Sequence, residues 1–218
     1  RGLEKIEELE AIAEPNDNQV RQFILRSKAI LGKLVDGKVE PYSLEEKLEM
    51  LFEAIRLTSP YFDIDHIDKG LYCIDEVKVI NQIANIYSKQ GKREQALQIF
   101  VQLIEYIKQH FHNAKQSGGL LPLVSFNYAR ELDLDGQYEK AIEVAHLGWE
   151  SCVQYGQYAT LPSSIEIIAE CYHFLGDDEK SKDYYKQAYY IYKAIGDSHG
   201  LDSMKTEIAK YFGSDFQL

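Results

Sequence analysis

The sequence predicts an all-α fold, a right-handed superhelical solenoid of helical hairpins stacked side by side. Three observations predict it. Glycine recurs at intervals of roughly 40 residues, a length typical of helical repeats, at Gly91, Gly136 and Gly176. Small and bulky residues flank each glycine at the same offsets. No segment combines the alternation and the β-branched enrichment that indicate a β-strand.

The offsets around each glycine describe two helices that cross closely. A small residue lies seven positions before the glycine, a bulky one four before and a small one five after: Ala84, Tyr87 and Ala96, then Ala129, Leu132 and Ala141, then Ala169, Tyr172 and Ser181. Small residues let two helix backbones approach, and glycine takes the left-handed conformation that ends the first helix. Such a hairpin has an apolar face that only a neighbouring hairpin can cover.

The chain divides into an N-terminal helix, a series of repeats and a closing helix. Residues 1–16 carry many acids and one apolar edge, so this helix either packs on the solenoid or leads to an upstream domain and a partner subunit. The repeats occupy residues 17–195, as four copies at 17–60, 74–111, 120–155 and 161–195. Residues 196–218 form a turn and a helix that caps this chain or docks on a second one.

Two details of the repeats need their own expectation. The first copy is degenerate, with helices at 18–31 and 42–60 separated by an inserted loop that ends in GKVEP, and residues 113–122 form a longer connection. Near the end, Tyr185, Tyr189 and Tyr192 follow helical spacing. We expect this stripe to pack in the core against the closing helix.

Composition excludes several classes of function. The net charge of −11 works against binding nucleic acid or an anionic membrane through this segment. No apolar run reaches the roughly 18 residues that span a bilayer. Three widely separated cysteines in apolar contexts, Cys73, Cys152 and Cys171, suggest buried thiols in a reducing cytoplasm. Because the chain starts with Arg1 inside a helix, we expect it to be a fragment of a longer protein.

The sequence contains no familiar catalytic or cofactor motif. Phosphate-binding loops, nucleophile elbows, dinucleotide fingerprints and zinc-protease signatures are all absent from it. Its closely spaced histidines and cysteines stand two apart, where helical side chains diverge instead of meeting on one ion. We therefore predict a protein that is not an enzyme, with no catalytic residue, metal or cofactor.

The hairpin pattern resembles the tetratricopeptide repeat. More specifically, four stretches resemble the carboxy-terminal half of the XRE-type helix-turn-helix transcription regulators of Gram-positive bacteria, the PlcR-like and Rgg-like group: residues 45–64, 76–99, 155–176 and 182–200. The resemblance implies a cytoplasmic homodimer with an effector site. It also implies that DNA is bound only through a helix-turn-helix domain that this chain lacks, so the residues upstream of Arg1 would test it.

Candidate ligand contacts follow from the face that the first helix of each hairpin turns to the concave surface. Asparagine amides both donate and accept, which suits an extended peptide backbone. An aromatic ring could seat a side chain, and a cation could pair with a carboxylate. The candidates are Lys78, Asn81 and Asn85, then Phe126, Asn127 and Arg130, then Glu166 and Glu170. The alternative is that the asparagines follow the repeat consensus and are simply solvated.

The function that the sequence favours is sensing by binding. We expect the ligand-sensing and dimerisation domain of a bacterial transcription regulator, with a peptide or protein segment in its concave groove. The alternative is a tetratricopeptide scaffold that joins two proteins and is unrelated to transcription.

Overall fold

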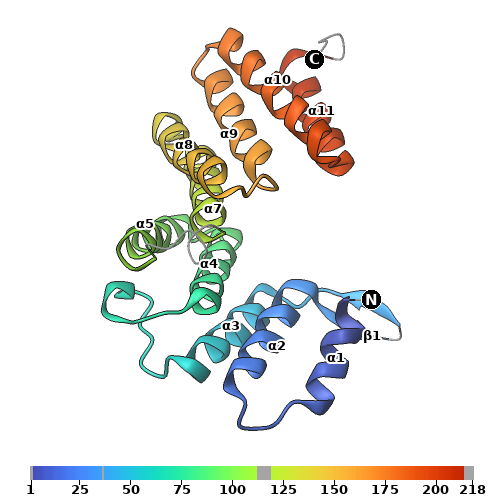
Figure 1. The fold of residues 1–218 in the computed structure, drawn as a ribbon, viewed down its shortest axis with the longest axis vertical. Helices are drawn as coiled ribbons and strands as arrows, with labels where there is room; N and C mark the ends of the chain where they lie inside the picture. Colours follow the sequence, from blue (N-terminus) through green and yellow to red (C-terminus); the bar gives the residue numbers. More distant parts are fainter. Residues whose placement is uncertain (1, 36, 112–118, 214–218) are drawn as a thin grey trace. The chain divides into compact units, whose positions relative to one another are not determined.

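The computed structural model describes residues 2–35, 37–111 and 119–213, so most of the connection predicted at 113–122 and the end of the closing segment lie outside the described residues. The described chain is predominantly helical (Figure 1). It forms two compact units, Arg1–Tyr106 and Ile107–Leu218. The predicted all-α class of paired helices is confirmed within each unit. The finer division into an N-terminal helix, four copies and a cap stays a prediction.

Unit 1 contains five helices, one short 3₁₀ turn and one small hairpin among its described residues. In chain order these are α1 Gly2–Ile12, α2 Asn18–Leu31, β1 Lys33–Val35, β2 Lys38–Glu40, α3 Leu44–Thr58, η1 Ile67–Lys69, α4 Ile74–Lys89 and α5 Arg93–His110, within which the unit ends. Side-chain caps fix two of the helix starts. Asp17 accepts a hydrogen bond from the Val20 amide at the start of α2. Ser43 and Glu46 form a reciprocal capping box at the start of α3.

The expectation of an irregular inserted loop after α2 is wrong. Residues 33–40 form a two-stranded antiparallel hairpin, with Leu34 opposite Val39 and Val35 opposite Lys38. Gly37 lies in its turn at φ +75°. Gly32 precedes it at φ +98°, where an added Cβ would lie 2.3 Å from the Glu40 carbonyl oxygen. The sequence criterion for a strand requires apolar and polar residues to alternate over at least about four residues. Each strand of this hairpin has three residues, so the criterion did not detect it.

The N-terminal helix packs on its own unit. Leu3 and Ile6 of α1 are buried against α2, and Lys28 of α2 forms an ion pair with Glu10. The sequence left two roles open for this helix, packing on the solenoid or leading to an upstream domain and a partner subunit. The structure shows the first, since α1 packs against α2.

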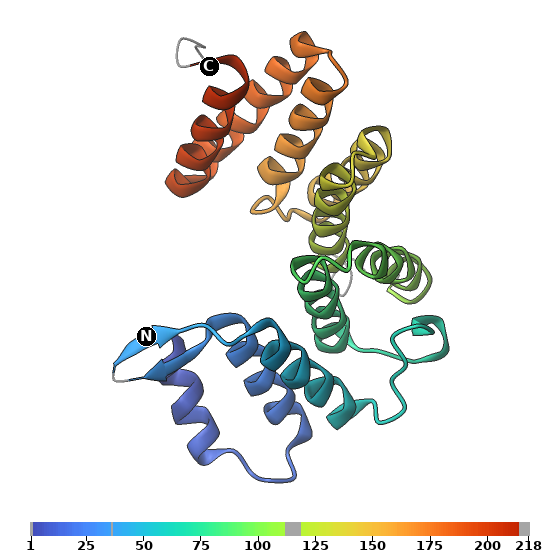
Figure 2. The same cartoon turned by 180° about the vertical axis from the view of Figure 1, so that it is seen from behind.

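Unit 2 is a run of helices in which each helix folds back on the one before it (Figures 1 and 2). Its described helices are α7 Leu120–Leu134, α8 Tyr138–Tyr155, α9 Leu161–Phe174, α10 Asp178–Ile195 and α11 Ser198–Phe212. Contacts join α7 to α8, α8 to α9 and α9 to α10, and α7 also touches α9. Stacking of first helices on one another is what a solenoid requires.

The three repeat glycines make the predicted turns. Their φ angles are +78°, +75° and +83° at Gly91, Gly136 and Gly176. In each turn the residue after the glycine donates its amide hydrogen to the carbonyl of the bulky residue four positions before the glycine, across 2.9 Å. This is the Schellman arrangement, which satisfies a carbonyl that the helix end would otherwise leave unpaired.

The small residues lie where helices cross. The six residues seven before and five after the glycines are fully buried: Ala84, Ala96, Ala129, Ala141, Ala169 and Ser181. A further contact of this kind lies on α8, where a Cβ added to Gly148 would meet the Ser125 Cβ at 3.1 Å and the Ser164 Oγ at 3.4 Å. Glycine there allows α8 to approach α7 and α9 together.

The closing helix α11 covers the end of unit 2. Met204 and Ile208 are buried in one cluster with Tyr185 and Tyr192 of α10, and Tyr189 packs against the same cluster. At Gly200 an added Cβ would lie 2.2 Å from the Tyr192 ring. The expected packing of the tyrosine stripe against the closing helix is thus confirmed.

Two expectations from composition can be compared with the structure. Cys152 and Cys171 are buried, but Cys73 is exposed, because it precedes the first turn of α4 instead of facing a helix partner. No helix among the described residues is long and apolar enough to cross a membrane.

Enlarging a crossing residue should destabilise the fold. For Ala169→Leu we expect a loss of about 1–3 kcal/mol in the free energy of unfolding, because the added atoms must displace α10. Urea unfolding followed by circular dichroism measures it. The matched control is Ala194→Leu, at an exposed position on α10, with an expected change within about 0.5 kcal/mol. Equal stabilities of the two variants would contradict the close crossing.

Candidate ligand-binding pocket

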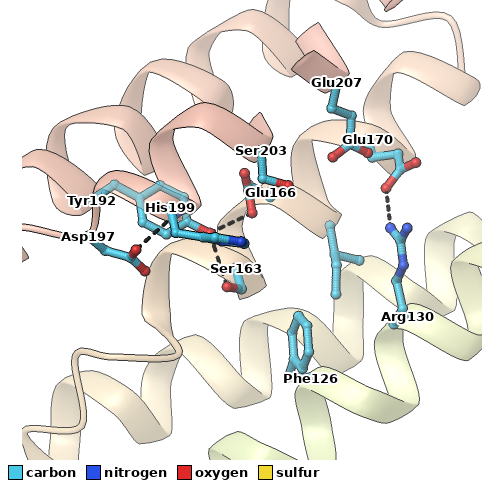
Figure 3. A pocket seen from close by; sticks show the side chains of 12 residues that line it. Phe126, Arg130, Ser163, Glu166, Glu170, Tyr192, Asp197, His199, Ser203 and Glu207 are labelled. Atoms are coloured by element: carbon cyan, nitrogen blue, oxygen red, sulfur yellow. Dashed lines mark hydrogen bonds and ion pairs between the residues drawn. The ribbon is translucent and has the colours of Figure 1, made fainter. Parts of the chain in front are cut away.

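A pocket of about 360 Å³ opens in unit 2, between α7, α9, α10 and α11 (Figure 3). Its walls differ in chemistry. Phe126 of α7 and Ile167 of α9 are apolar, whereas Arg130 of α7 and Glu166 and Glu170 of α9 are charged. The pocket therefore lies where the first helices of two successive hairpins meet and where the closing helix covers them.

One ion-pair network forms the wall shared by α7 and α9. Arg130 Nη1 donates to Glu170 Oε2 at 2.6 Å and lies 3.6 Å from Asp133 Oδ2. The Tyr211 hydroxyl of α11 donates to the other oxygen of Glu170 at 2.7 Å. Cys171 donates its thiol hydrogen to Asp133 at 3.4 Å. The network links α7, α9 and α11. Because Glu170 and Asp133 are both buried, its hydrogen bonds lie in surroundings of low polarity, where they are electrostatically stronger than in water.

A second set of hydrogen bonds joins α9 to α10. The Tyr192 hydroxyl donates to Glu166 Oε2 at 2.7 Å, and the Ser163 hydroxyl lies 3.1 Å from the same phenol oxygen. Figure 3 shows the three side chains converging on one wall of the pocket. Because the phenol hydrogen is directed to the carboxylate, Ser163 is the donor to the tyrosine oxygen.

The start of α11 closes the remaining side. Asp197 caps this helix, since its Oδ1 accepts a hydrogen bond from the Gly200 amide at 2.9 Å. His199 and Ser203 line the pocket one turn apart, and Glu207 follows with its carboxylate beside that of Glu170 (Figure 3).

The carboxyl groups of this pocket hold their protons unusually firmly. Burial raises the pKa of Glu166 to about 8, although its hydrogen bond from Tyr192 acts in the opposite direction. Burial, then repulsion from Glu170, raises the pKa of Glu207 to about 7. The same two causes raise the pKa of Asp133 above its ordinary value. Charge removed from water and placed beside like charge favours the neutral acid.

The structure brings together four of the residues predicted from sequence. Phe126, Arg130, Glu166 and Glu170 all line this pocket. Asn127 is half-buried on α7 and does not line it. Arg130 pairs with Glu170 and Asp133 in this structure, and its contact with a ligand carboxylate stays a prediction.

The other three candidates lie on α4 in unit 1. Asn81 is fully buried, so the exposed face that was expected for it is absent in this structure. Asn85 is half-buried, one turn further along the same helix. Lys78 is partly exposed and lies 3.3 Å from Asp75, one turn before it. A contact from any of these residues to a ligand stays a prediction.

Sequence reasoning missed the residues that α10 and α11 contribute. Tyr192 was expected only in the core, and its ring is buried there, but its hydroxyl reaches the pocket. Asp197, His199 and Glu207 gave no signal, because they belong to the closing helix and not to the repeat pattern. The one available signal was that a tyrosine predicted to be buried carries a hydroxyl group, which usually needs a hydrogen-bond partner.

The fold is that of a helical-repeat domain with a pocket between its first helices. The sequence matches the family described as the RNPP family C-terminal domain over residues 3–199. The chain therefore belongs to the RNPP family, and the predicted resemblance to PlcR-like regulators is confirmed at that level. A comparison with curated proteins gives no match.

Solved structures share the fold at low sequence identity. PlcR of Bacillus thuringiensis in its apo form is 18% identical, with 94% of this chain and 70% of that chain covered and a TM-score of 0.71. Its complex with the peptide PapR7 and DNA matches at 17% identity, 92% and 74% coverage and a TM-score of 0.55. Aspartyl phosphate phosphatase F of Bacillus subtilis matches at 12% identity and a TM-score of 0.70, with 95% of this chain covering 49% of it.

Removing the Tyr192 hydroxyl should raise the Glu166 pKa further. In Tyr192→Phe the carboxylate loses the hydrogen bond that stabilises its charged form, so the pKa should move above about 8. Carbon-detected NMR titration of the glutamate carboxyl groups measures the shift. Tyr190→Phe, at an exposed position on α10, serves as the control. An unchanged or lowered Glu166 pKa in Tyr192→Phe would contradict the hydrogen bond.

The pocket acids should make the fold less stable as pH rises. A glutamate with an ordinary pKa of 4.5 when unfolded and about 8 when folded binds more protons in the folded state between those values. Its contribution is complete below pH 4.5 and is lost as pH rises through about 8, and Glu207 acts in the same direction.

Urea unfolding between pH 5 and pH 9 measures this dependence. We expect a smaller loss of stability with pH in Glu166→Gln than in the wild type, because the amide stays neutral throughout. Glu179→Gln on the exposed surface of α10 should keep the wild-type slope. A wild-type slope in Glu166→Gln would show that this carboxyl is not the cause.

Proposed function

We propose that this chain is the ligand-sensing and dimerisation domain of a bacterial transcription regulator and that it binds a peptide segment on its helical repeats. The observation that carries the proposal is the pocket itself, built where α7 and α9, the first helices of successive hairpins, meet. Membership in the RNPP family supports it. So does the similarity to PlcR, which was solved in complex with the peptide PapR7 and DNA.

The pocket offers the mixture of surfaces that a peptide side chain needs. Phe126 and Ile167 supply apolar walls, and the hydroxyls of Ser163 and Ser203 supply hydrogen-bonding groups beside the carboxylates. Small-ligand sites commonly combine apolar walls with a few polar groups that fix orientation. Outside the pocket, the half-buried amides of Asn127 on α7 and Asn85 on α4 are further candidates for backbone contacts within their own units.

An occupant would act through the helices that it touches. Residues of α7, α9, α10 and α11 line the pocket, and α11 rests on the others at the end of unit 2. A ligand that binds one packing of these helices more tightly than another shifts the population toward that packing. In the regulator this shift would change how two subunits present DNA-binding domains, with the whole protein working as a cytoplasmic homodimer.

A protein-binding scaffold is the second candidate. The fold similarity to aspartyl phosphate phosphatase F of Bacillus subtilis favours it, because a similar helical arrangement then belongs to a protein named for a different role. A helix-turn-helix segment encoded upstream of Arg1 would support the regulator. Further helical hairpins there would support the scaffold.

Peptide binding can be tested directly with this chain. We expect the immobilised protein to retain members of a random peptide pool, identified by mass spectrometry. Phe126→Ala should weaken the affinity of retained peptides by about tenfold, as expected for loss of an aromatic anchor. Fluorescence anisotropy with labelled copies of those peptides measures it.

Glu179→Gln, exposed on α10 and outside the pocket, provides the control and should bind as the wild type does. If the wild type retains no peptide above background, or if Phe126→Ala binds equally well, the proposed site is wrong.

A further inference from the structure

The charges that face the pocket are unbalanced. Four carboxyl groups line it, from Glu166, Glu170, Asp197 and Glu207, and they come from α9 and from the start and middle of α11. Positive charge is scarce in the pocket. Arg130 is the only guanidinium among the described lining residues, and His199 carries a charge only when it is protonated. A ligand that enters this space meets more negative than positive charge.

Arg130 does not correct the imbalance. Its guanidinium is 2.6 Å from Glu170 and 3.6 Å from Asp133, so two buried carboxylates share one cation. Within the part of the chain that the structure describes, neither Glu166 nor Glu207 forms an ion pair, although the charge of Arg130 acts on both and that of Lys210 acts on Glu207. Glu166 instead accepts a neutral hydrogen bond from Tyr192.

A buried hydroxyl lies close to the same carboxyl groups. Tyr185 is fully buried on α10, and its hydroxyl finds no hydrogen-bond partner among the described residues. Burial raises the pKa of this hydroxyl, and the nearby carboxyl groups of Glu207, Glu170 and Glu166 raise it further, although Tyr185 itself does not line the pocket. Buried hydroxyls are rarely left without a partner.

We propose that this pocket receives a positively charged side chain of the peptide, a lysine ammonium or an arginine guanidinium, whose head group binds between Glu166 and Glu207. The inference rests on the proposed function and names the chemistry of the residue that the site selects. Phe126 and Ile167 would cover the aliphatic stem of that side chain. Long cationic side chains commonly combine an apolar stem with a polar head in this way.

Both the shape and the walls of the pocket favour an organic cation over a bare metal ion. Among the described residues, no group of three or more acidic, histidine or cysteine side chains is arranged to hold a metal. A volume of about 360 Å³ with an aromatic wall instead fits a side chain, and a cation over an aromatic face gains a further attraction.

Entry of the cation should displace protons. Because burial and neighbouring charge raise the pKa of Glu166 to about 8 and that of Glu207 to about 7, both groups are at least partly protonated near neutral pH. A positive ligand that favours their ionised forms must therefore release hydrogen ions on binding. Affinity for the cation should therefore rise with pH. His199 also lines the pocket, so the same measurement on His199→Gln is needed to separate its contribution.

The test compares a cation with its neutral counterpart. Two peptide pools, acetylated and amidated at their ends, are identical except for a central arginine or a central citrulline, which is close in shape but uncharged. We expect the arginine pool to bind at least about tenfold more tightly, the size of a charge-assisted hydrogen bond. Calorimetry in buffers of different ionisation enthalpy should show net proton release with the arginine pool alone.

Variants assign the preference to the pocket. The arginine preference should fall by about tenfold in Glu166→Gln and Glu207→Gln and persist in Glu179→Gln. Circular dichroism confirms that each variant folds, and the wild-type comparison of the two pools does not depend on any variant. Equal binding of both pools, or binding of neither, overturns the cation site. Retention of neutral peptides with no arginine preference overturns this inference while leaving the proposed function in place.

Discussion

The structure depends on the close crossing of helices at small residues. At Ala129, Ala141 and Ala169 in unit 2, the side chains have no exposed surface, because the neighbouring backbone covers them. Gly148 extends this constraint to a helix that must approach two neighbours at once. When first helices pack this tightly, side chains one turn apart on α7 lie beside side chains of α9 in the next hairpin. These side chains form one part of the pocket lining.

Close packing also explains the unusual chemistry of the pocket. Glu170 and Asp133 are carried on stacked first helices, and both are buried as a result of that stacking. Arg130 is the counter-ion that both carboxylates share. Without it they would be buried without a positive partner, which would destabilise the fold. The remaining acids, Glu166 and Glu207, respond to the same low-polarity surroundings by holding protons. A pocket lined by carboxyl groups thus follows from a packing rule that concerns only small side chains.

Much of the fold and part of the site could be predicted from sequence. The repeat glycines, their flanking small residues and the tyrosine stripe all behave as their spacing predicts, because each depends on the geometry of one hairpin. Phe126, Arg130, Glu166 and Glu170 were found from the same geometry. Asn81 was expected to be exposed but is buried. The spacing of residues along a helix shows which of them share a face, but it does not show which part of that face neighbouring helices cover. The short hairpin at 33–40 escaped a rule made for longer strands.

The sequence by itself determined the helical pairs, their turns and the excess of negative charge, since these follow from local spacing and composition. Only the tertiary structure decided which charges meet. Arg130 and Glu170 are 40 residues apart, Glu170 and Tyr211 are 41 apart, and Glu166 and Tyr192 are 26 apart. No local pattern encodes such distances. They are set by how one hairpin settles on the next and by where the closing helix comes to rest, and the strength of an interaction between charges depends on that separation and on the water that burial removes.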